Sequence, residues 1–379
     1  MKLKDILKAK NIFSLISTLF FIASATILIF TAKGYIYNIN GKKLEKTGMI
    51  VANSEPKGAL LYLNDQLQNV TNTTLSNLIP ENYHLKIQKE GYTSWEKDIK
   101  VEENVVIQID ARLFPMNPSL TPVTLYGCYN PQVNLDNTKI VFQVRDNEEK
   151  NGVWLLVFNN LPFGKGYDLK QILKDTANIK YSQAESLWSQ DGNELLVSIQ
   201  NDNITENYIV TNDILSTSVT KSTKTKEEII MKWKIEADSL TKDKISTLSL
   251  NTQGIIKDKT IFWSPDQNKF YYENRDGFVE VYDLEKETIT TSTIKISDYQ
   301  SVIWFIDSER FIFVENNEET KSGKLSITEI DGQNKVSVYE GILISKEVFV
   351  SPNGNKLFFL TNFNPSSSTS TNLYTLNLD

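Results

Sequence analysis

The chain has 379 residues and a formal net charge of −7, so it is long enough for more than one domain. The first 46 residues carry a net charge of +6, and the remainder therefore carries −13, the difference between these two values. An acidic body of this kind excludes nucleic acid as a partner and disfavours adhesion to anionic lipid. One histidine and one cysteine exclude a Cys/His zinc site and an intramolecular disulfide.

An uncharged apolar segment occupies residues 12–32. As a helix it is long enough to cross the hydrocarbon core of a bilayer. Tyr35 and Tyr37 follow at the depth where aromatic rings favour the membrane interface. A cleaved signal peptide is the alternative, but its apolar region is shorter, about 7–15 residues. We predict a retained transmembrane helix at 12–32.

The orientation of this helix depends on the lysines around it. Four lysines precede the segment and four follow it within the first 46 residues, so the positive-inside count is a tie. Lys8 and Lys10 lie close to the segment, and long trailing domains are translocated largely regardless of charge. We therefore predict a single-pass cell-membrane protein with a cytoplasmic tail at 1–11, a linker at 33–47 and extracytoplasmic β domains.

Residues 48–114 predict a small β-sandwich, because short alternating apolar runs are separated by turn residues. The five predicted strands are 49–51, 59–63, 83–88, 95–101 and 105–109.

Two turn motifs in this region resemble those of the PEGA domain family. They are Ser54-Glu-Pro-Lys-Gly-Ala59 and Lys89-Glu-Gly-Tyr92, the second followed by Trp95. Asn64-Asp65 and Asn82 depart from the family pattern, which has glycine more often, although asparagine tolerates the backbone that such turns need. The resemblance implies an envelope-associated binding or spacer module without catalysis.

After a proline-containing linker at 115–119, one pattern recurs five times within residues 120–379. A turn residue, Asp or Asn, is preceded three positions earlier by Trp or Val and followed by three consecutive apolar residues. The anchors are Asp136, Asp191, Asp266, Asp307 and Asn353, and the apolar triplets begin at Ile140, Leu195, Phe270, Phe311 and Leu357. A third strand follows each triplet. Sheets repeated in this way cover one another's faces around an axis, which predicts a β-propeller.

The best-formed turns, Trp263-Ser-Pro-Asp266 and Trp188-Ser-Gln-Asp-Gly192, resemble those of TolB-like and WD-type propeller repeats. This resemblance covers 120–379 and concerns architecture. The interval between Asp191 and Asp266 is too long for one blade of about 40–45 residues, so Trp233 is predicted to open a hidden blade. Six blades are therefore predicted, with five or seven as alternatives, and the fold class is all-β behind the N-terminal helix.

The last predicted strand, 372–378, aligns with the third strand of the earlier units. Its blade would then have an exposed edge, which proteins normally cover. The β-rich segment 120–126 contains Pro122, which suits an edge position. We predict that this segment pairs with the C-terminal strand and closes the ring.

No nucleophile motif, P-loop or dinucleotide motif is present in the sequence. His84 is predicted to be a surface strand residue, and Cys128 a buried apolar one. No catalytic, cofactor-binding or metal-binding residue is predicted. Asp and Glu residues are numerous, so their number alone leaves a glycosidase acid–base pair as an alternative.

The links between the second and third strands of the units are rich in carboxylates and amides. In a propeller such links emerge on one face, so they predict a polar rim, which we call the loop rim. Its candidate residues are Asp146, Glu148, Glu149, Asp202, Asn203, Glu206, Glu273, Asp276, Asn316 and Glu318. Exposed hairpins are polar in most proteins, so the alternative is a solvated edge without function. No link has calcium-loop spacing, so a Ca²⁺ site has no motif behind it.

The favoured functional hypothesis is a non-enzymatic, membrane-anchored binding or scaffold protein. Preformed loops on a stiff ring bind with little ordering cost, and the partner would be a glycan, a protein or another envelope component. The alternative is an extracellular glycan or peptide hydrolase with carboxylates on the propeller face. Fold alone does not decide between them.

Overall fold

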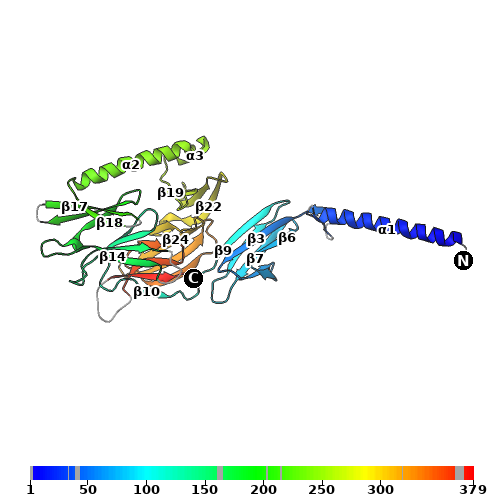
Figure 1. Ribbon diagram of the computed structural model, residues 1–379, viewed down its shortest axis with the longest axis horizontal. Helices are drawn as coiled ribbons and strands as arrows, with labels where there is room; N and C mark the ends of the chain where they lie inside the picture. Colours follow the sequence, from blue (N-terminus) through cyan, green and yellow to red (C-terminus); the bar gives the residue numbers. More distant parts are fainter. Residues whose placement is uncertain are drawn as a thin grey trace. The chain divides into compact units, whose positions relative to one another are not determined.

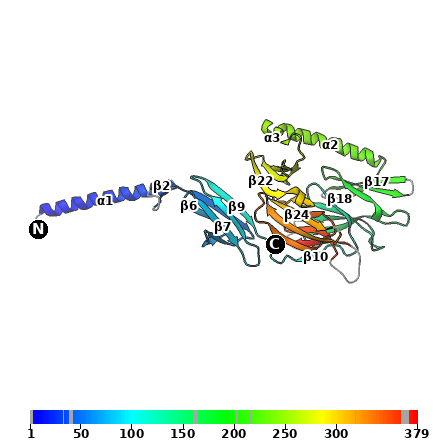
Figure 2. The same cartoon turned by 180° about the vertical axis from the view of Figure 1, so that it is seen from behind.

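The structure is a computed structural model that describes residues 3–32, 34–38, 43–159, 165–201, 204–213, 216–317, 319–362 and 371–379. The chain divides into two compact units, Met1–Phe114 and Pro115–Asp379, and each is described by itself (Figures 1 and 2).

The first unit begins with one long helix, α1 (Leu3–Ala32). Its stretch Phe13–Ala32 has a mean hydropathy of 2.2 and no buried share, so it is long and apolar enough to cross a membrane. The segment predicted as a linker contains a short antiparallel hairpin of β1 (Tyr35–Asn38) and β2 (Lys43–Lys46). Lysines alternate with apolar and acidic residues in β2, and this short polar pattern was too weak to predict a strand.

Two facing sheets form the rest of the first unit (Figure 1). One sheet has the order β6-β3-β9 and the other β5-β4-β7-β8. The strands are β3 (Gly48–Glu55), β4 (Leu60–Leu63), β5 (Gln66–Val70), β6 (Thr73–Leu78), β7 (Asn82–Gln88), β8 (Trp95–Lys100) and β9 (Val106–Arg112). The five predicted strands are confirmed. The other two, β5 and β6, are polar edge strands, and every residue of β5 is exposed, so no alternating apolar pattern indicated them.

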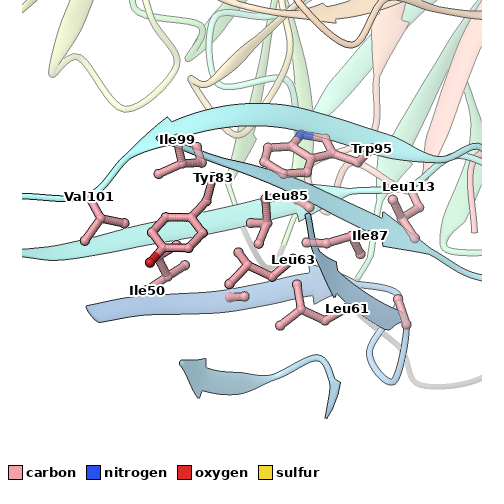
Figure 3. Close-up of a cluster of buried hydrophobic side chains, with 13 residues drawn as sticks. Ile50, Leu61, Leu63, Tyr83, Leu85, Ile87, Trp95, Ile99, Val101 and Leu113 are labelled. Atoms are coloured by element: carbon pink, nitrogen blue, oxygen red, sulfur yellow. The ribbon is translucent and has the colours of Figure 1, made fainter. Parts of the chain in front are cut away.

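The core of the sandwich comes from the inward residues of these strands. In β7, Tyr83, Leu85 and Ile87 are buried at period two, and Trp95 of β8 packs with them (Figure 3). Alternation of this kind is what a half-buried strand requires.

The two turn motifs of the sandwich meet in space. Ser54 Oγ lies 2.7 Å from the Pro56 carbonyl oxygen and 2.5 Å from Thr71 Oγ1. Lys89 Nζ donates to the Lys57 carbonyl oxygen at 2.6 Å. The second motif therefore satisfies a backbone carbonyl group of the first.

The described residues of the second unit form five four-stranded antiparallel sheets, which are the blades of a β-propeller. Blade 1 consists of β11 (Tyr129–Val133), β12 (Lys139–Val144), β13 (Gly152–Phe158) and β14 (Tyr167–Lys174), and blade 2 of β15 (Glu185–Trp188), β16 (Glu194–Asn201), β17 (Ile204–Asp213) and β18 (Ser216–Ser222). Blade 3 consists of β19 (Phe262–Trp263), β20 (Lys269–Glu273), β21 (Phe278–Asp283) and β22 (Thr288–Lys295), and blade 4 of β23 (Ser301–Trp304), β24 (Arg310–Asn317), β25 (Ser322–Glu329) and β26 (Val336–Ile342). Blade 5 consists of β27 (Val348–Val350), β28 (Lys356–Thr361), β29 (Asn372–Asn377) and β10 (Leu120–Pro122).

The repeated turn has one hydrogen-bond pattern, which accounts for its sequence. Ser264 Oγ donates to Asp266 at 2.6 Å and accepts from the Lys269 backbone N–H at 2.9 Å. Blades 2 and 5 repeat this pattern with Ser189–Asp191 and Ser351–Asn353. The serine and the carboxylate or amide together satisfy the backbone of a tight turn.

The hidden sixth blade is not found in the described residues. The long interval between blades 2 and 3 folds instead as α2 (Lys226–Thr247) and α3 (Leu250–Ile256), and Trp233 lies in α2. Thr225 and Glu228 form a capping box at the start of α2. The described residues therefore form five blades, the alternative count, and not the favoured six. The T-x-x-E pattern of Thr225 and Glu228 is a helix signal, and Trp233 belongs to that helix and not to a blade.

Most neighbouring blades pack directly on one another. Tyr339 and Phe359 place their ring centres 4.6 Å apart between blades 4 and 5. Shared apolar clusters include Val141 and Leu195 between blades 1 and 2, Tyr271 and Phe311 between blades 3 and 4, and Ile140 and Phe358 between blades 5 and 1. Blades 2 and 3 share no cluster among the described residues: blade 2 packs on α2, and blade 3 packs on α3 and the end of α2.

The tryptophan of the repeat joins neighbouring blades by a hydrogen bond. Trp188 Nε1 of blade 2 donates to the Gln132 carbonyl oxygen of blade 1 at 3.1 Å. Trp304 Nε1 of blade 4 donates to the Phe262 carbonyl oxygen of blade 3 at 3.0 Å. Trp263 occupies the equivalent position in blade 3. Lys244 Nζ of α2 lies over its indole ring, 3.3 Å from the ring centre. The helix thus replaces the blade-to-blade contact at this one seam.

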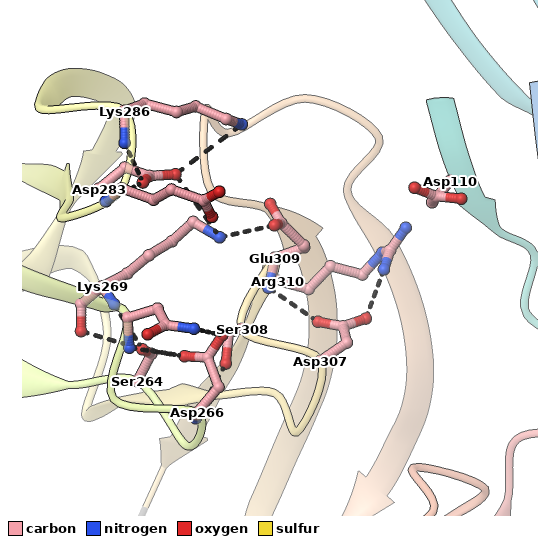
Figure 4. A network of polar contacts seen from close by, with 12 residues as sticks. Asp110, Ser264, Asp266, Lys269, Asp283, Lys286, Asp307, Ser308, Glu309 and Arg310 are labelled. Carbon is pink, nitrogen blue, oxygen red and sulfur yellow. Dashed lines mark hydrogen bonds and ion pairs between the residues drawn. The ribbon is translucent and has the colours of Figure 1, made fainter. Parts of the chain in front are cut away.

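A polar network reinforces the seam between blades 3 and 4 (Figure 4). Lys269, whose side chain is 9% exposed, pairs with Glu309 at 2.6 Å and lies 3.9 Å from Asp283. The Asp266 backbone N–H donates to Ser308 Oγ at 3.3 Å. Burial alone would lower the pKa of Lys269, but the hydrogen bond and charge of Glu309 outweigh it, so this pKa is raised.

The prediction that the segment before blade 1, residues 120–126, pairs with the C-terminal strand and closes the ring is confirmed. β10 pairs antiparallel with β29, with Leu120 opposite Leu376 and Pro122 opposite Tyr374. Asn372 strengthens this closure, because its Oδ1 accepts from Thr124 Oγ1 and from the Gly127 backbone N–H, both at 3.0 Å.

We expect Asn372→Ala to lower the free energy of unfolding of the propeller by about 1–3 kcal/mol, because two donors at the closure lose their acceptor. Denaturant unfolding of the full chain, followed by circular dichroism, measures this. Asn377→Ala is the matched control, since among the described residues its side chain bonds only to the Asp379 backbone carbonyl oxygen. Equal destabilisation by both variants would contradict the assigned role of Asn372.

We expect Trp304→Phe to cost about 1–3 kcal/mol, because the Phe262 carbonyl oxygen loses its donor. Trp263→Phe should cost less, because the ring contact with Lys244 survives the exchange. Paired unfolding curves of the two variants test this order, and a larger loss for Trp263→Phe would show that the seam hydrogen bond is unimportant.

Candidate functional site

A cavity of about 1550 Å³ lies within the second unit, between the innermost strands of the blades, the turns that follow them and α2. Its lining residues come from all five blades and from α2, which crosses from blade 2 to blade 3. Blades 2 and 3 share no apolar cluster among the described residues, and residues of α2 between them line one side of the cavity.

The wall of the cavity is apolar. Each innermost-strand residue that lines it is aliphatic or aromatic: Val133, Phe262, Trp263, Val302, Ile303, Trp304, Val348 and Val350. Most other lining residues come from the turns between first and second strands and from α2, and they include Asn137, Gln190, Lys232 and Glu236. The cavity therefore has an apolar wall and a polar mouth.

Helix α2 is held at its two ends. Near its start, Ile229 and Trp233 are buried against blade 2, and Trp233 Nε1 donates to Glu194 at 2.9 Å. Near its end, Lys244 bonds to Gln267 as well as stacking on Trp263. Between these anchors, residues 234–243 include no buried residue, and this middle part of α2 borders the cavity.

The carboxylates of the mouth are engaged locally. Burial opposes ionisation of Asp191, but hydrogen bonds from Ser189 and Asn193 outweigh it and lower the pKa of Asp191. Glu194 accepts from Trp233, and Glu236 lies 3.6 Å from Lys232. A carboxylic acid that acts as a general acid needs a raised pKa. The pKa of Asp191 is lowered instead, so Asp191 does not suit that role. Among the described residues, no group of three His, Cys, Asp or Glu side chains could hold a metal ion.

The loop rim lies away from this cavity. Asp202, Asn203 and Glu318 fall outside the described residues. The other seven candidates are in or next to links between second and third strands, and none of them lines the cavity. Since the strands are antiparallel, these links are on the opposite side of each blade from the turns that border the cavity.

Some rim residues have structural partners. Asp146 accepts from Tyr129 Oη at 3.1 Å, and Glu206 pairs with Lys221 at 2.5 Å. Glu148 and Glu149 are exposed. Within the described ranges, no hydrogen bond or ion pair joins one rim residue to another, so the rim stays a prediction.

The residues that matter in the cavity were missed by sequence reasoning. Leu135, Leu240 and Phe262 come from a turn, a helix and a strand, and they line one cavity only in the folded ring. The capping box of α2 was the one signal that a helix crosses here. Cys128 is buried, as predicted, and burial strongly raises its thiol pKa.

Three solved structures are similar to this chain at low identity. TolB from Acinetobacter baumannii is 13% identical with a TM-score of 0.25, covering 85% of this chain and 64% of its own, so this chain spans less than two thirds of that protein. A putative TolB from Agrobacterium tumefaciens is 12% identical with a TM-score of 0.22, covering 85% and 99%. The β-propeller domain of the Trilobed protease from Pyrococcus furiosus is 13% identical with a TM-score of 0.23, covering 68% and 72%. The propeller assignment rests on the strand order above and not on these likenesses.

A comparison with curated proteins finds no match. The family comparison matches residues 47–117 to the PEGA domain, the range that holds both turn motifs and all seven strands of the sandwich. The sandwich of the first unit is therefore similar to the PEGA domain.

Proposed function

We propose that this chain is a non-enzymatic binding or scaffold protein of the cell envelope, anchored in the membrane by α1. Its N-terminus is cytoplasmic, and the PEGA domain and the propeller are extracytoplasmic. The apolar helix supports the anchor, and the PEGA match supports the envelope association.

The observation that carries the binding function is the cavity beneath α2. A cavity with a large apolar wall and a few polar groups at its mouth is the common form of a ligand site. Because the mouth carboxylates are engaged by neighbouring side chains, binding is better supported than hydrolysis. The extracellular hydrolase is the runner-up, and no feature of the mouth favours it.

The loop rim is a second proposed surface. Its exposed carboxylates would attract a cationic or hydroxyl-rich envelope component, with Glu148 and Glu149 as the most accessible pair. The rim and the cavity are on opposite sides of the blades, so the two surfaces can be tested independently.

We expect the full-length protein to stay in membranes during carbonate extraction, because α1 is long enough to span the hydrocarbon core. Protease added to intact cells should digest everything beyond about residue 33. A soluble mature protein beginning near Gly34 would contradict the anchor, and a protected propeller would contradict the orientation.

We expect the full chain in lipid nanodiscs to bind envelope fragments saturably and without turning over glycans, peptides or esters. The double variant Glu148→Gln/Glu149→Gln should weaken this binding about threefold, the size expected for losing exposed charge pairs. Glu285→Gln/Glu287→Gln, an exposed acidic pair in the link between β21 and β22, is the matched control. Absence of binding, or turnover that disappears in Asp191→Asn, would contradict the proposed function.

A further inference from the structure

The two halves of the cavity lining differ in polarity, and this difference constrains the ligand. The innermost strands contribute only apolar and aromatic side chains, of which Val302, Ile303, Val348 and Val350 are typical. Polar atoms come mainly from the turns and from α2. A ligand that matches both parts has an apolar body and a polar end.

Three large apolar side chains are exposed in this one cavity. Leu135 is 67% exposed, Leu240 is 63% exposed and Phe262 is 46% exposed, and all three line the cavity. They come from blade 1, α2 and blade 3, so no single element can cover them. Covering such side chains with an apolar group is favourable in proportion to the area removed from water.

The charges at the mouth disfavour an anionic ligand. Two lysines, Lys232 and Lys244, face three carboxylates, Asp191, Glu194 and Glu236, so the lining carries a net charge of −1 by subtraction. These groups already have partners within the mouth.

Neutral amides complete the mouth. Asn137 and Gln190 line it, and their side chains make no hydrogen bond with another residue in the described part of the chain. Amides of this kind bind hydroxyl groups as donors and acceptors.

We propose that the cavity binds an uncharged amphiphile, with an alkyl chain against the strand wall and a hydroxyl-rich head at the mouth. This inference rests on the proposed binding function and names the ligand class. A glycan without an alkyl chain would leave the apolar wall in water. The volume exceeds the roughly 300–1000 Å³ of common small-molecule sites, which suits a ligand with a long chain and a bulky head.

The test uses the full chain in lipid nanodiscs and a dodecyl maltoside brominated on its alkyl chain, below its micelle concentration. Bromine quenches indole fluorescence on contact, and Trp233, Trp263 and Trp304 line the cavity. We expect saturable quenching that is about tenfold weaker in Leu240→Gln, because one buried leucine contact is lost. Ile235→Gln is the matched control, since Ile235 is 58% exposed on the same helix but does not line the cavity.

Three further probes identify the class. Maltose alone and an apolar decapeptide should not displace the probe, and brominated dodecyl sulfate should bind more weakly because of its charge. Quenching that does not saturate, or that is equal in Leu240→Gln and the original chain, overturns the proposal, as does displacement by maltose or the peptide. Both variants are at exposed positions, so folding is preserved. A chain that still binds envelope fragments but fails this test overturns the amphiphile alone, whereas loss of envelope binding overturns the proposed function.

Discussion

The second strand of each propeller blade is buried on both faces, and the arrangement of the second unit depends on this constraint. Phe270, Tyr271 and Tyr272 are consecutive and almost fully buried, as are Phe311, Ile312 and Phe313. A strand of this kind needs a neighbour on each side of its sheet. A ring is the arrangement in which every sheet has two such neighbours, and pairing β10 with β29 joins the end of the ring to its beginning.

The seam between blades 2 and 3 meets the same constraint by different means. Here α2 and α3 cover the sheet faces, with Trp233 on blade 2 and Ile256 on blade 3. A helix is narrower than a four-stranded sheet, so the coverage holds at the ends of the insert and fails in its middle. The cavity borders this middle part of α2, and its apolar wall comes from the innermost strands of blades 1, 3, 4 and 5.

The sequence predicts the repeated parts of this fold well and the irregular parts poorly, for physical reasons. The triplets beginning at Ile140 and Leu357 identified buried strands because burial on two faces demands consecutive apolar residues. The strands β5 and β6 were not predicted because an edge strand exposed to water does not need consecutive or alternating apolar residues. Trp233 was predicted to belong to a blade because a tryptophan can pack from a helix as well as from a strand. The capping box of Thr225 and Glu228 is the signal that identifies the helix.

The site was harder to predict than the fold because it has no local pattern. Leu135, Leu240 and Phe262 are far apart in the sequence, and each alone is an ordinary exposed apolar residue. Their proximity depends on ring closure, which is a property of the whole unit. The loop rim was the more visible candidate because repeated polar links are local, although polarity in a link is also the default for exposed hairpins.

The helix between blades 2 and 3 removes the direct blade-to-blade packing at that seam, and this loss needs a physical explanation. Blades 1 and 2 and blades 3 and 4 are joined by a tryptophan hydrogen bond and a shared core, whereas α2 has a stretch, residues 234–243, without a buried residue. Departures from consistent packing in natural proteins concentrate at functional sites. The insert between blades 2 and 3 also supplies Leu240, Lys232 and Glu236 to the cavity lining. The insert therefore separates blades 2 and 3 and also supplies part of the cavity lining, which links the irregularity of the ring to the proposed binding function.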